Sequence, residues 1–206
     1  MQYDQIPSDE IISQTVKALE ANGISAVVVE TAEQAKQKAL EIIPTNAEVM
    51  TMTSITLDET GIAEALNESG NYDSVRNDLE KMNRETDSKK MQQLGAAPDW
   101  AVGSVHSITQ TGEVVIASNT GSQLPAYVYG SPHVLWVVGA QKIVKDIAEA
   151  QTRIKNYIEP LETKRARTAY GLPDTFHTNT SKLLIISREI NPERIKVIIV
   201  KEKLGF

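Results

Sequence analysis

The sequence predicts an α/β fold in which an open, mostly parallel sheet is flanked by helices. Short runs of β-branched apolar residues alternate along the chain with stretches whose apolar residues recur at helical spacing, and glycine or proline ends several of these stretches. Strands that alternate with helices are typical of parallel sheets, because a crossover helix returns the chain to the same edge. With 206 residues, of which 41% are hydrophobic, the chain can bury the core of one domain, and we expect that domain to span residues 1–206.

The N-terminal part of the chain shows the alternation most clearly. In the first helical stretch Ser8 is a suitable N-cap and Gly23 ends the helix, while Pro44 ends the second helix. The run from Ile24 to Val29 is continuously apolar, which is typical of a strand buried on both faces. In order, we expect a helix over 8–22, a strand over 24–29, a helix over 32–43, a strand over 47–51 and a helix over 57–68.

The segment 71–98 interrupts this alternation. Ten of its 28 residues are charged, and its apolar residues are widely spaced. An apolar face this thin buries little surface. We therefore expect a charged helical insertion, or flap, that lies over the edge of the sheet and is mobile.

The C-terminal half is predicted to complete the sheet. Thr111–Gly112 lies between two extended segments, which predicts a hairpin. A long amphipathic stretch follows later and is expected to bend or end at Pro160. In order, we expect strands over 100–108, 113–117 and 134–138, a helix over 141–159, and two closing strands over 183–187 and 195–201.

The composition excludes several kinds of chemistry. Because the chain has no cysteine, it holds no disulfide, thiolate nucleophile, zinc–thiolate site or cysteine-ligated iron–sulfur cluster. His106, His133 and His177 lack the spacing of metal ligands, so no metal site is expected. The acidic N-terminus has no signal-peptide core, and no stretch approaches the ~20 apolar residues of a membrane span. We therefore expect a cytoplasmic protein without a membrane span.

Charge is distributed unevenly along the chain. Residues 1–140 carry a net charge of −11 and residues 141–206 a net charge of +5, which together give the −6 of the whole chain. The basic third either attracts an anionic ligand or a charged partner, or consists of cations on solvated helix faces. A nucleic-acid partner is not expected, because the whole chain is acidic and its ten aromatic residues are scattered.

The strongest sign of a ligand site is the loop that follows the strand 113–117. Backbone N–H groups point outward at a junction between a strand and a helix, and hydroxyl and amide side chains add donors. Gly121 allows a ligand to approach the backbone. The same residue types are common in turns, so a plain turn is the alternative. The predicted ligand-binding residues of this loop are Ser118, Asn119, Thr120, Gly121, Ser122 and Gln123.

A second polar loop follows the strand 47–51. Thr56 and Glu59 are three residues apart, which is the spacing of a capping box, so we expect Thr56 to cap the next helix. This leaves Thr53 and Ser54 free to face a ligand. In open α/β sheets ligands bind beyond the carboxyl ends of strands, so the two loops flank one crevice if their strands run parallel.

Four further residues are candidates for a site. His106 and Ser104 would face the same side of an extended segment and suggest a Ser–His pair, with a hydrogen-bonded structural histidine as the alternative. Glu113 and Glu59 are candidates for acid–base catalysis, with a solvated carboxylate or a capping role as the alternatives. Lys142 is expected at the start of a long helix, where the dipole disfavours a cation, and this mismatch favours a ligand-binding role.

Six segments of the chain together form a recognisable pattern. They are TSITLDETGI (53–62), DWAVGSVH (99–106), TGEVVIAS (111–118), TGSQLPA (120–126), VVGAQKIV (137–144) and EKLGF (202–206). This pattern resembles the LUD (lactate-utilisation) domain family, and the resemblance extends over nearly the whole chain.

The resemblance implies both a fold and a biological context. The fold is the one shared by sugar-phosphate isomerases, glucosamine-phosphate deaminases and CoA transferases, which bind anionic sugar phosphates or CoA. The context is lactate oxidation, in which a small LUD subunit accompanies iron–sulfur partner proteins. Because this chain has no cysteine, any redox cofactor must be organic or must come from a partner.

Two classes of function therefore stay open. In the first, the chain is an enzyme or enzyme subunit that acts on a small hydroxy or keto acid, or on a phosphorylated or CoA-linked metabolite. In the second, it is a non-catalytic module that binds such a metabolite and regulates or scaffolds a partner. Both classes predict a small anionic ligand, and both are compatible with a homo-oligomer.

Overall fold

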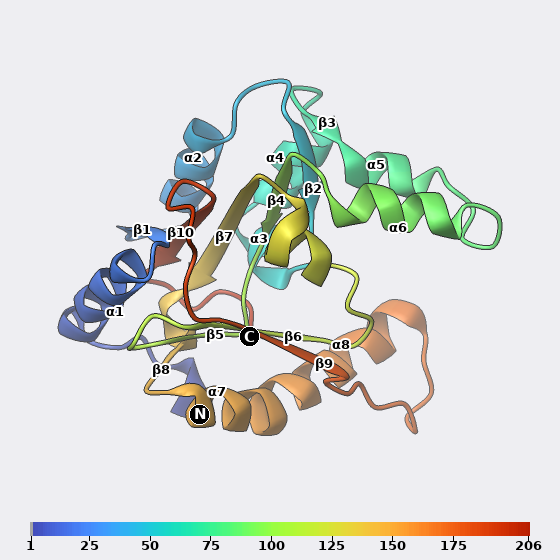
Figure 1. Ribbon diagram of the computed structural model, residues 1–206. Coiled ribbons are helices and arrows are strands. Elements are labelled where there is room, and N and C mark those ends of the chain that lie inside the picture. The colour runs from blue at the N-terminus through green and yellow to red at the C-terminus, as the bar shows by residue number, and fades with distance from the viewer. Residues whose placement is uncertain (1) are drawn as a thin grey trace.

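The computed structural model describes residues 2–206 and has a six-stranded sheet at its centre (Figure 1). Every pair of neighbouring strands in this sheet is parallel, so all carboxyl ends face the same edge. In spatial order the strands are β1 (Ser25–Val29), β10 (Ile195–Val200), β7 (His133–Gly139), β4 (Trp100–Gly103), β2 (Glu48–Thr51) and β3 (Asp73–Ser74). The predicted fold class, an open and mostly parallel sheet flanked by helices, is confirmed.

Helices cover both faces of this sheet, and the alternation of side chains along the central strands explains how. In β7, Trp136 and Val138 point into one buried cluster, whereas Leu135 and Val137 point into another. The first cluster includes residues of α1 (Asp9–Ala21). The second includes residues of α2 (Ala32–Ile42), α3 (Ile55–Glu59) and α4 (Ile62–Glu68).

Local sequence signals set the ends of these helices. The Ser8 side chain accepts a hydrogen bond from the first turn of α1, as predicted. The helix expected over 57–68 is instead two short helices. Gly61 separates α3 from α4 because it adopts a left-handed conformation (φ 67°) that interrupts the helical backbone.

A second sheet of four strands lies in the lower part of Figure 1. The hairpin predicted around Thr111–Gly112 is confirmed, since β5 and β6 pair antiparallel. The single strand expected over 100–108 is wrong, because the chain crosses from the first sheet to the second through Ser104–His106. Beyond Gly103 the neighbouring ladders end, and His106 N–H finds a new acceptor in β6. The strands of this sheet are β8 (Ile143–Val144), β5 (Ser107–Thr109), β6 (Val114–Ser118) and β9 (Lys182–Ile186).

The helix expected over 141–159 is confirmed only from Ile147 onward, and its predicted start at residue 141 is wrong. The helix begins only after Asp146, whose side chain accepts a hydrogen bond from Glu149 N–H and caps it. Pro160 does not end the helix: residues 147–170 are helical throughout, and Pro160 comes shortly after a π-helical turn. The observed elements are a 3₁₀ turn η3 (Ala140–Lys142), strand β8, α7 (Ile147–Arg153), a π-helical turn η4 (Ile154–Ile158) and α8 (Glu159–Tyr170).

The segment 71–98 is helical for most of its length, with α5 (Val75–Glu80) and α6 (Ser88–Ala96) extending to the right of the sheet in Figure 1. Its first residues form β3, which lengthens the sheet by one short edge strand. Val75 is buried, whereas α6 contributes no buried residue. The expected mobility of this segment stays a prediction that hydrogen exchange would test.

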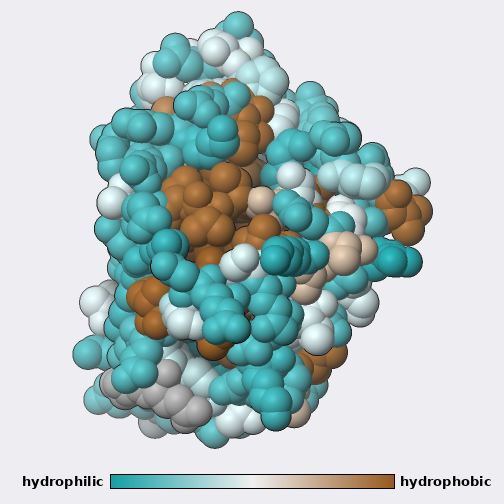
Figure 2. Space-filling model, turned by 90° about the vertical axis from the view of Figure 1, so that its left-hand side faces the viewer, coloured by the Kyte–Doolittle hydropathy of each residue, from teal (hydrophilic) through white to brown (hydrophobic). Residues whose placement is uncertain are grey.

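Strand β1 forms the other edge of the sheet and was expected to be fully buried. It pairs with β10 on one side only, so its residues 26–29 are half-buried. Figure 2, which shows the left-hand side of the molecule in Figure 1, accordingly has a continuous apolar area in the region of β1. Within residues 2–206, no helix combines the length and apolar character needed to cross a bilayer.

Candidate functional site

Three polar side chains meet beyond the carboxyl ends of three neighbouring strands. Thr56 follows β2, Ser104 follows β4 and Lys142 follows β7. Lys142 Nζ donates hydrogen bonds to Thr56 Oγ1 (3.0 Å) and to Ser104 Oγ (3.1 Å). This edge is where open α/β sheets bind their ligands. We refer to these three residues as the Lys142 site.

The turn after β7 directs Lys142 into the protein. A Cβ atom at Gly139 would lie 2.2 Å from Gln141 Oε1 and 2.7 Å from Leu204 N, so only glycine fits there. The following 3₁₀ turn then places the lysine side chain over the ends of the strands, where it is only 2% exposed. A lysine is rarely buried this completely without a carboxylate partner.

No ion pair involving Lys142 occurs among residues 2–206. Burial lowers the pKa of the Lys142 ammonium to about 7; repulsion from Arg153 adds to this effect and attraction by Glu59 opposes it. The charged and neutral forms are therefore close in free energy near neutral pH. Within the same part of the chain, no group of His, Asp and Glu residues is arranged to hold a metal ion.

A second buried cation lies next to the Lys142 site. Arg153 is fully buried, and its Nη1 donates to the backbone oxygen of His106 (2.7 Å). Its guanidinium lies 5.8 Å from the ring centre of Tyr3 and 5.2 Å from that of Tyr157, while Nε and Nη2 have no hydrogen-bond partner among the described residues. Burial lowers the pKa of Arg153 to about 10, so the group stays charged at neutral pH.

The charges of Lys142 and Arg153 both act on a third residue, His106. Its Nδ1 accepts a hydrogen bond from Ala117 N–H (3.1 Å). Burial, reinforced by Lys142 and Arg153, lowers the pKa of the imidazole to about 3, so the ring is neutral. No hydrogen bond joins it to Ser104 among the described residues, and the predicted Ser–His pair stays untested.

The backbone of residues 204–206, which we call the closing segment, covers the Lys142 site. Gln141 Nε2 donates to Leu204 O (2.9 Å), and Leu204 N–H donates back to Gln141 Oε1 (3.4 Å). Thr56 Oγ1 donates to the same Leu204 oxygen (3.3 Å). The carboxylate of Glu59 accepts a hydrogen bond from Gly205 N–H (2.7 Å). These contacts attach the closing segment to elements that also build the site.

Gly205 shows how closely the closing segment approaches. Its φ of +59° is left-handed, and an added Cβ would lie 2.6 Å from Thr56 Oγ1 and 3.4 Å from Lys142 Nζ. A ligand that reaches the amine from this side must therefore displace the closing segment.

The predicted capping role of Thr56 is wrong. Ser54 is the N-cap of α3, since its Oγ accepts a hydrogen bond from Leu57 N–H (3.4 Å). Thr56 is buried in the Lys142 site, and Glu59 bonds to the closing segment. Of the two loop residues predicted to face a ligand, Thr53 is exposed and Ser54 is half-buried. One signal could have revealed Thr56 and Ser104, namely that each follows the end of a parallel strand.

The loop 118–123 follows β6, which belongs to the second sheet and not to the sheet of β2. Ser118 Oγ donates to Gln123 Oε1 (2.9 Å) and accepts from Gly121 N–H (2.8 Å). The loop thus bonds largely to itself, while the adjacent Ala117 contacts His106. Ligand binding by this loop stays a prediction.

Glu113 lies at the β5–β6 turn, away from the contacts that build the Lys142 site. The hydroxyls of Thr109 and Thr111 donate to its carboxylate and hold the pKa of that carboxyl below its usual range. The turn packs against α1, where Asn22 Nδ2 donates to Thr111 O (3.0 Å). No contact among the described residues joins Glu113 to Lys142, and its acid–base role stays untested.

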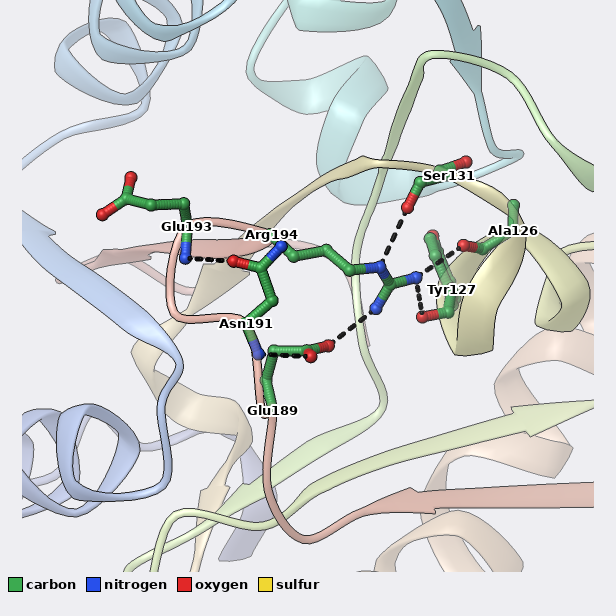
Figure 3. A network of polar contacts seen from close by, with 7 residues as sticks. All are labelled: Ala126, Tyr127, Ser131, Glu189, Asn191, Glu193 and Arg194. Carbon is green, nitrogen blue, oxygen red and sulfur yellow. Dashed lines mark hydrogen bonds and ion pairs between the residues drawn. The ribbon is translucent and has the colours of Figure 1, made fainter.

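A buried arginine at the amino ends of β7 and β10, the opposite edge of the sheet from the Lys142 site, anchors one wall of the protein (Figure 3). Arg194 donates to the backbone oxygens of Ser131, Ala126 and Tyr127, at 2.9, 3.1 and 2.8 Å, and to the Glu189 carboxylate at 2.8 Å. These contacts hold the π-helical turn η2 (Ala126–Gly130) against the sheet.

Within this wall, Tyr127 packs edge-on against Trp136, with ring centres 5.4 Å apart. A Cβ atom at Gly103 would lie only 1.9 Å from the hydroxyl oxygen of Tyr127. Position 103 must therefore be glycine. The wall thus reaches the residue that precedes Ser104.

Comparison with protein families identifies the chain. The family model described as the LUD domain matches residues 12–200. The chain belongs to the LUD domain family. Membership of this family supports a role related to lactate utilisation in general terms.

Solved structures agree with this assignment at the level of the fold. The LUD domain chain is similar to a crystallised DUF162 family protein from Deinococcus radiodurans, with a TM-score of 0.58 and 15% sequence identity. The similarity covers 95% of this chain and 99% of the other. None of the curated proteins matches the sequence.

Proposed function

We propose that this LUD domain chain binds a small anionic metabolite, a hydroxy or oxo carboxylate, at the Lys142 site and takes part in hydroxy-acid (lactate) oxidation with partner proteins. The observation that carries the proposal is the burial of Lys142 without a carboxylate partner. A buried charge is unfavourable unless it is paired and hydrogen-bonded, and a bound carboxylate would provide both.

The hydrogen-bonding capacity of the site supports the same ligand. An ammonium group has three N–H donors, and Thr56 and Ser104 use two of those of Lys142. The third is available for a carboxylate oxygen. Arg153, whose Nε and Nη2 have no partner among the described residues, adds positive potential at Lys142.

In this proposal, the loop residues that the sequence predicts to bind a ligand form the rim of the Lys142 site. Thr53 is exposed in the loop that follows β2, and Lys142 follows the end of β7 in the same sheet. The loop 118–123 starts one residue after Ala117, which contacts His106. We assign ligand contacts to Thr53, to Ser54 and to the donors of this loop, with the buried amine as the main determinant of affinity.

Oxidation of a hydroxy acid requires a partner in this proposal. The conversion of a 2-hydroxy acid to a 2-oxo acid releases two electrons and two protons. Since the chain has no cysteine, a cysteine-ligated iron–sulfur cluster that accepts these electrons would belong to another protein. The family resemblance implies iron–sulfur partners of this kind.

A second function is favoured by the closing segment. Because Leu204 and Gly205 cover the amine, a metabolite would bind only when these residues move. A non-catalytic module that reports metabolite binding to a partner would use this coupling directly. Turnover of lactate with an artificial electron acceptor, by the chain alone or with iron–sulfur proteins, separates this module from an oxidising subunit.

Binding is tested by thermal denaturation with lactate, pyruvate, phosphate, sugar phosphates, nucleotides and CoA. A ligand at a hundredfold excess over its Kd stabilises the native state by about 2.7 kcal/mol, which raises the melting temperature by roughly 5–10 °C for a chain of this size. We expect the shift for small carboxylates and its loss in Lys142→Met. The exposed neighbour Lys145→Met is the control and should keep the full shift. A shift that survives in Lys142→Met would place the ligand elsewhere.

A further inference from the structure

We propose that the Lys142 amine is a nucleophile that forms an imine with the carbonyl carbon of a small 2-oxo acid. This inference rests on the proposed function, because it names the ligand that would react at the same site. It assigns covalent chemistry to a group that ligand binding alone does not require.

The partners of the amine are suited to this chemistry. Lys142 Nζ contacts the hydroxyls of Thr56 and Ser104 and, within residues 2–206, no carboxylate. A carboxylate would stabilise the ammonium, which has no lone pair for attack, whereas a hydroxyl can accept a hydrogen bond from an ammonium or donate one to a neutral amine. The hydroxyls therefore support both protonation states of the nitrogen.

Burial supplies the reactive form. With a pKa lowered to about 7, roughly half of Lys142 is neutral near pH 7, whereas an ordinary lysine is neutral on the order of one time in a thousand. Desolvated lysines of this kind act as nucleophiles toward carbonyl compounds.

The reaction proceeds in two balanced steps without a change in oxidation state. First, the nitrogen lone pair attacks the carbonyl carbon, a C–N bond forms, the C=O π bond breaks, and one proton moves from nitrogen to oxygen to give a carbinolamine. Second, the hydroxyl takes up a proton and leaves as water while the C=N bond forms. Ser104 and Thr56, within 3.1 Å of Nζ, are placed to pass these protons.

The site also restricts the class of ligand. A 2-hydroxy acid such as lactate has no carbonyl carbon beside its carboxylate and cannot form the imine. The ligand must be small, because a Cβ at Gly205 would already lie 3.4 Å from Nζ. After reaction, the protonated imine keeps a positive charge beside the carboxylate of the ligand, so the charge pairing of the site is preserved.

The test uses the full chain with pyruvate and sodium cyanoborohydride at pH 7, followed by intact-mass measurement and peptide mapping. Reduction of the imine gives a secondary amine, so the chain should gain the mass of pyruvic acid less one oxygen atom. We expect this adduct at Lys142 at least about tenfold faster than at any exposed lysine, because of its larger neutral fraction. Lactate should give no adduct.

Variants distinguish the contribution of the Lys142 amine to labelling from that of its neighbours. Lys142→Met should lose the fast adduct, and Lys145→Met should keep it. Ser104→Ala retains the amine and should slow labelling severalfold. Peptide mapping of the labelled wild-type chain shows whether the adduct is on Lys142 even if Lys142→Met does not fold.

The outcomes distinguish the two proposals. If pyruvate and lactate both stabilise the chain in a Lys142-dependent manner but no adduct forms at Lys142, the imine is excluded and the binding site stands. If labelling is equal on all lysines, the imine is likewise excluded. An adduct at Lys142 together with loss of pyruvate stabilisation in Lys142→Met supports both.

Discussion

Two buried cations, Arg194 and Lys142, lie near the same sheet in opposite situations. Arg194 donates four hydrogen bonds and pairs with the Glu189 carboxylate. Lys142 donates two hydrogen bonds to hydroxyls and pairs with no carboxylate in the described part of the chain. An arginine paired with a carboxylate and bonded to backbone oxygens fixes a backbone, as Arg194 does for η2, whereas the unpaired charge of Lys142 favours an external anion. For these two residues, the pairing of the buried charge distinguishes a structural role from the proposed ligand-binding role.

The largest effect on stability is expected from removing the paired cation, Arg194. Arg194→Met leaves the Glu189 carboxylate, whose side chain is only 11% exposed, without its cationic partner and removes a donor from each of three backbone oxygens. Loss of one member of a buried pair should lower the free energy of unfolding by about 3–5 kcal/mol. Urea denaturation measures this loss. Adding Glu189→Gln should restore part of it, and equal stability of Arg194→Met and the double variant would show that the unpaired carboxylate does not cause the loss.

Removing the unpaired cation, Lys142, should change the free energy of unfolding in the opposite direction. Lys142→Met removes an uncompensated buried charge and keeps a side chain of similar length. We expect the free energy of unfolding to rise by about 1–2 kcal/mol while ligand stabilisation is lost. A stability decrease comparable to that of Arg194→Met would show that Lys142 is structural.

The pH dependence of this gain sharpens the comparison. The pKa of Lys142 is lowered to about 7 by burial, so between pH 7 and the pKa of an unfolded lysine the unfolded chain binds more protons, and the wild type gains stability as pH rises. Lys142→Met lacks this gain. Its advantage should be constant below about pH 7 and should shrink by up to about 1.4 kcal/mol per pH unit above it. Urea denaturation in steps of ~1 pH unit, from about pH 6 to about pH 9, measures this stability difference between Lys142→Met and the wild type. A difference that stays constant up to about pH 9 would contradict the lowered pKa.

The closing segment offers a smaller perturbation at the same amine. Gly205→Ala places a Cβ 2.6 Å from Thr56 Oγ1 at a left-handed position, and should displace the segment and expose Lys142 to amine reagents. Gly171→Ala is a matched control, because Gly171 is also left-handed (φ +61°) but has open space around it. We expect both to lose about 1 kcal/mol from backbone strain. Only Gly205→Ala should increase labelling of Lys142, and equal labelling of the two variants would show that the segment does not limit access.

The smallest effect is expected at the loop 118–123. Ser122→Ala removes one exposed hydroxyl that accepts from Thr120 (3.1 Å) and should change stability by less than about 0.5 kcal/mol. If the loop contacts the ligand, the ligand-induced rise in melting temperature should fall; an unchanged rise would leave the loop as a turn. Gly121→Val is a poorer test, since its Cβ would lie 2.6 Å from Lys182 Cδ.

The sequence was a good guide wherever one period dominated a segment. Short apolar runs rich in valine and isoleucine identified β1, β7 and β10, and Ser8 located the start of α1. It failed where the chain changes partners within a few residues. The chain from Gly139 to Asp146 makes a 3₁₀ turn, a short strand and a cap, although its apolar spacing resembles a helix.

The site was harder to predict than the fold, for a physical reason. Lys142 was selected because a cation at a helix start is unfavourable, yet it lies in a turn and is unusual because it is buried. Thr56 fitted a capping pattern, but Ser54 two residues earlier competes for the same N–H groups and caps α3. Burial and competition of this kind depend on contacts between distant segments, such as Thr56 with Leu204, which local spacing does not encode.

The hydrogen bond from Ala117 to His106 also fixes the tautomer of the imidazole. Because Nδ1 accepts the Ala117 N–H, the neutral ring must carry its proton on Nε2. Proton uptake at Nδ1 would break a contact of β6, so His106 is suited to donate a hydrogen bond and poorly suited to remove a proton. In a ligand complex its contribution would be an oriented N–H dipole, whose direction is set by a strand of the second sheet.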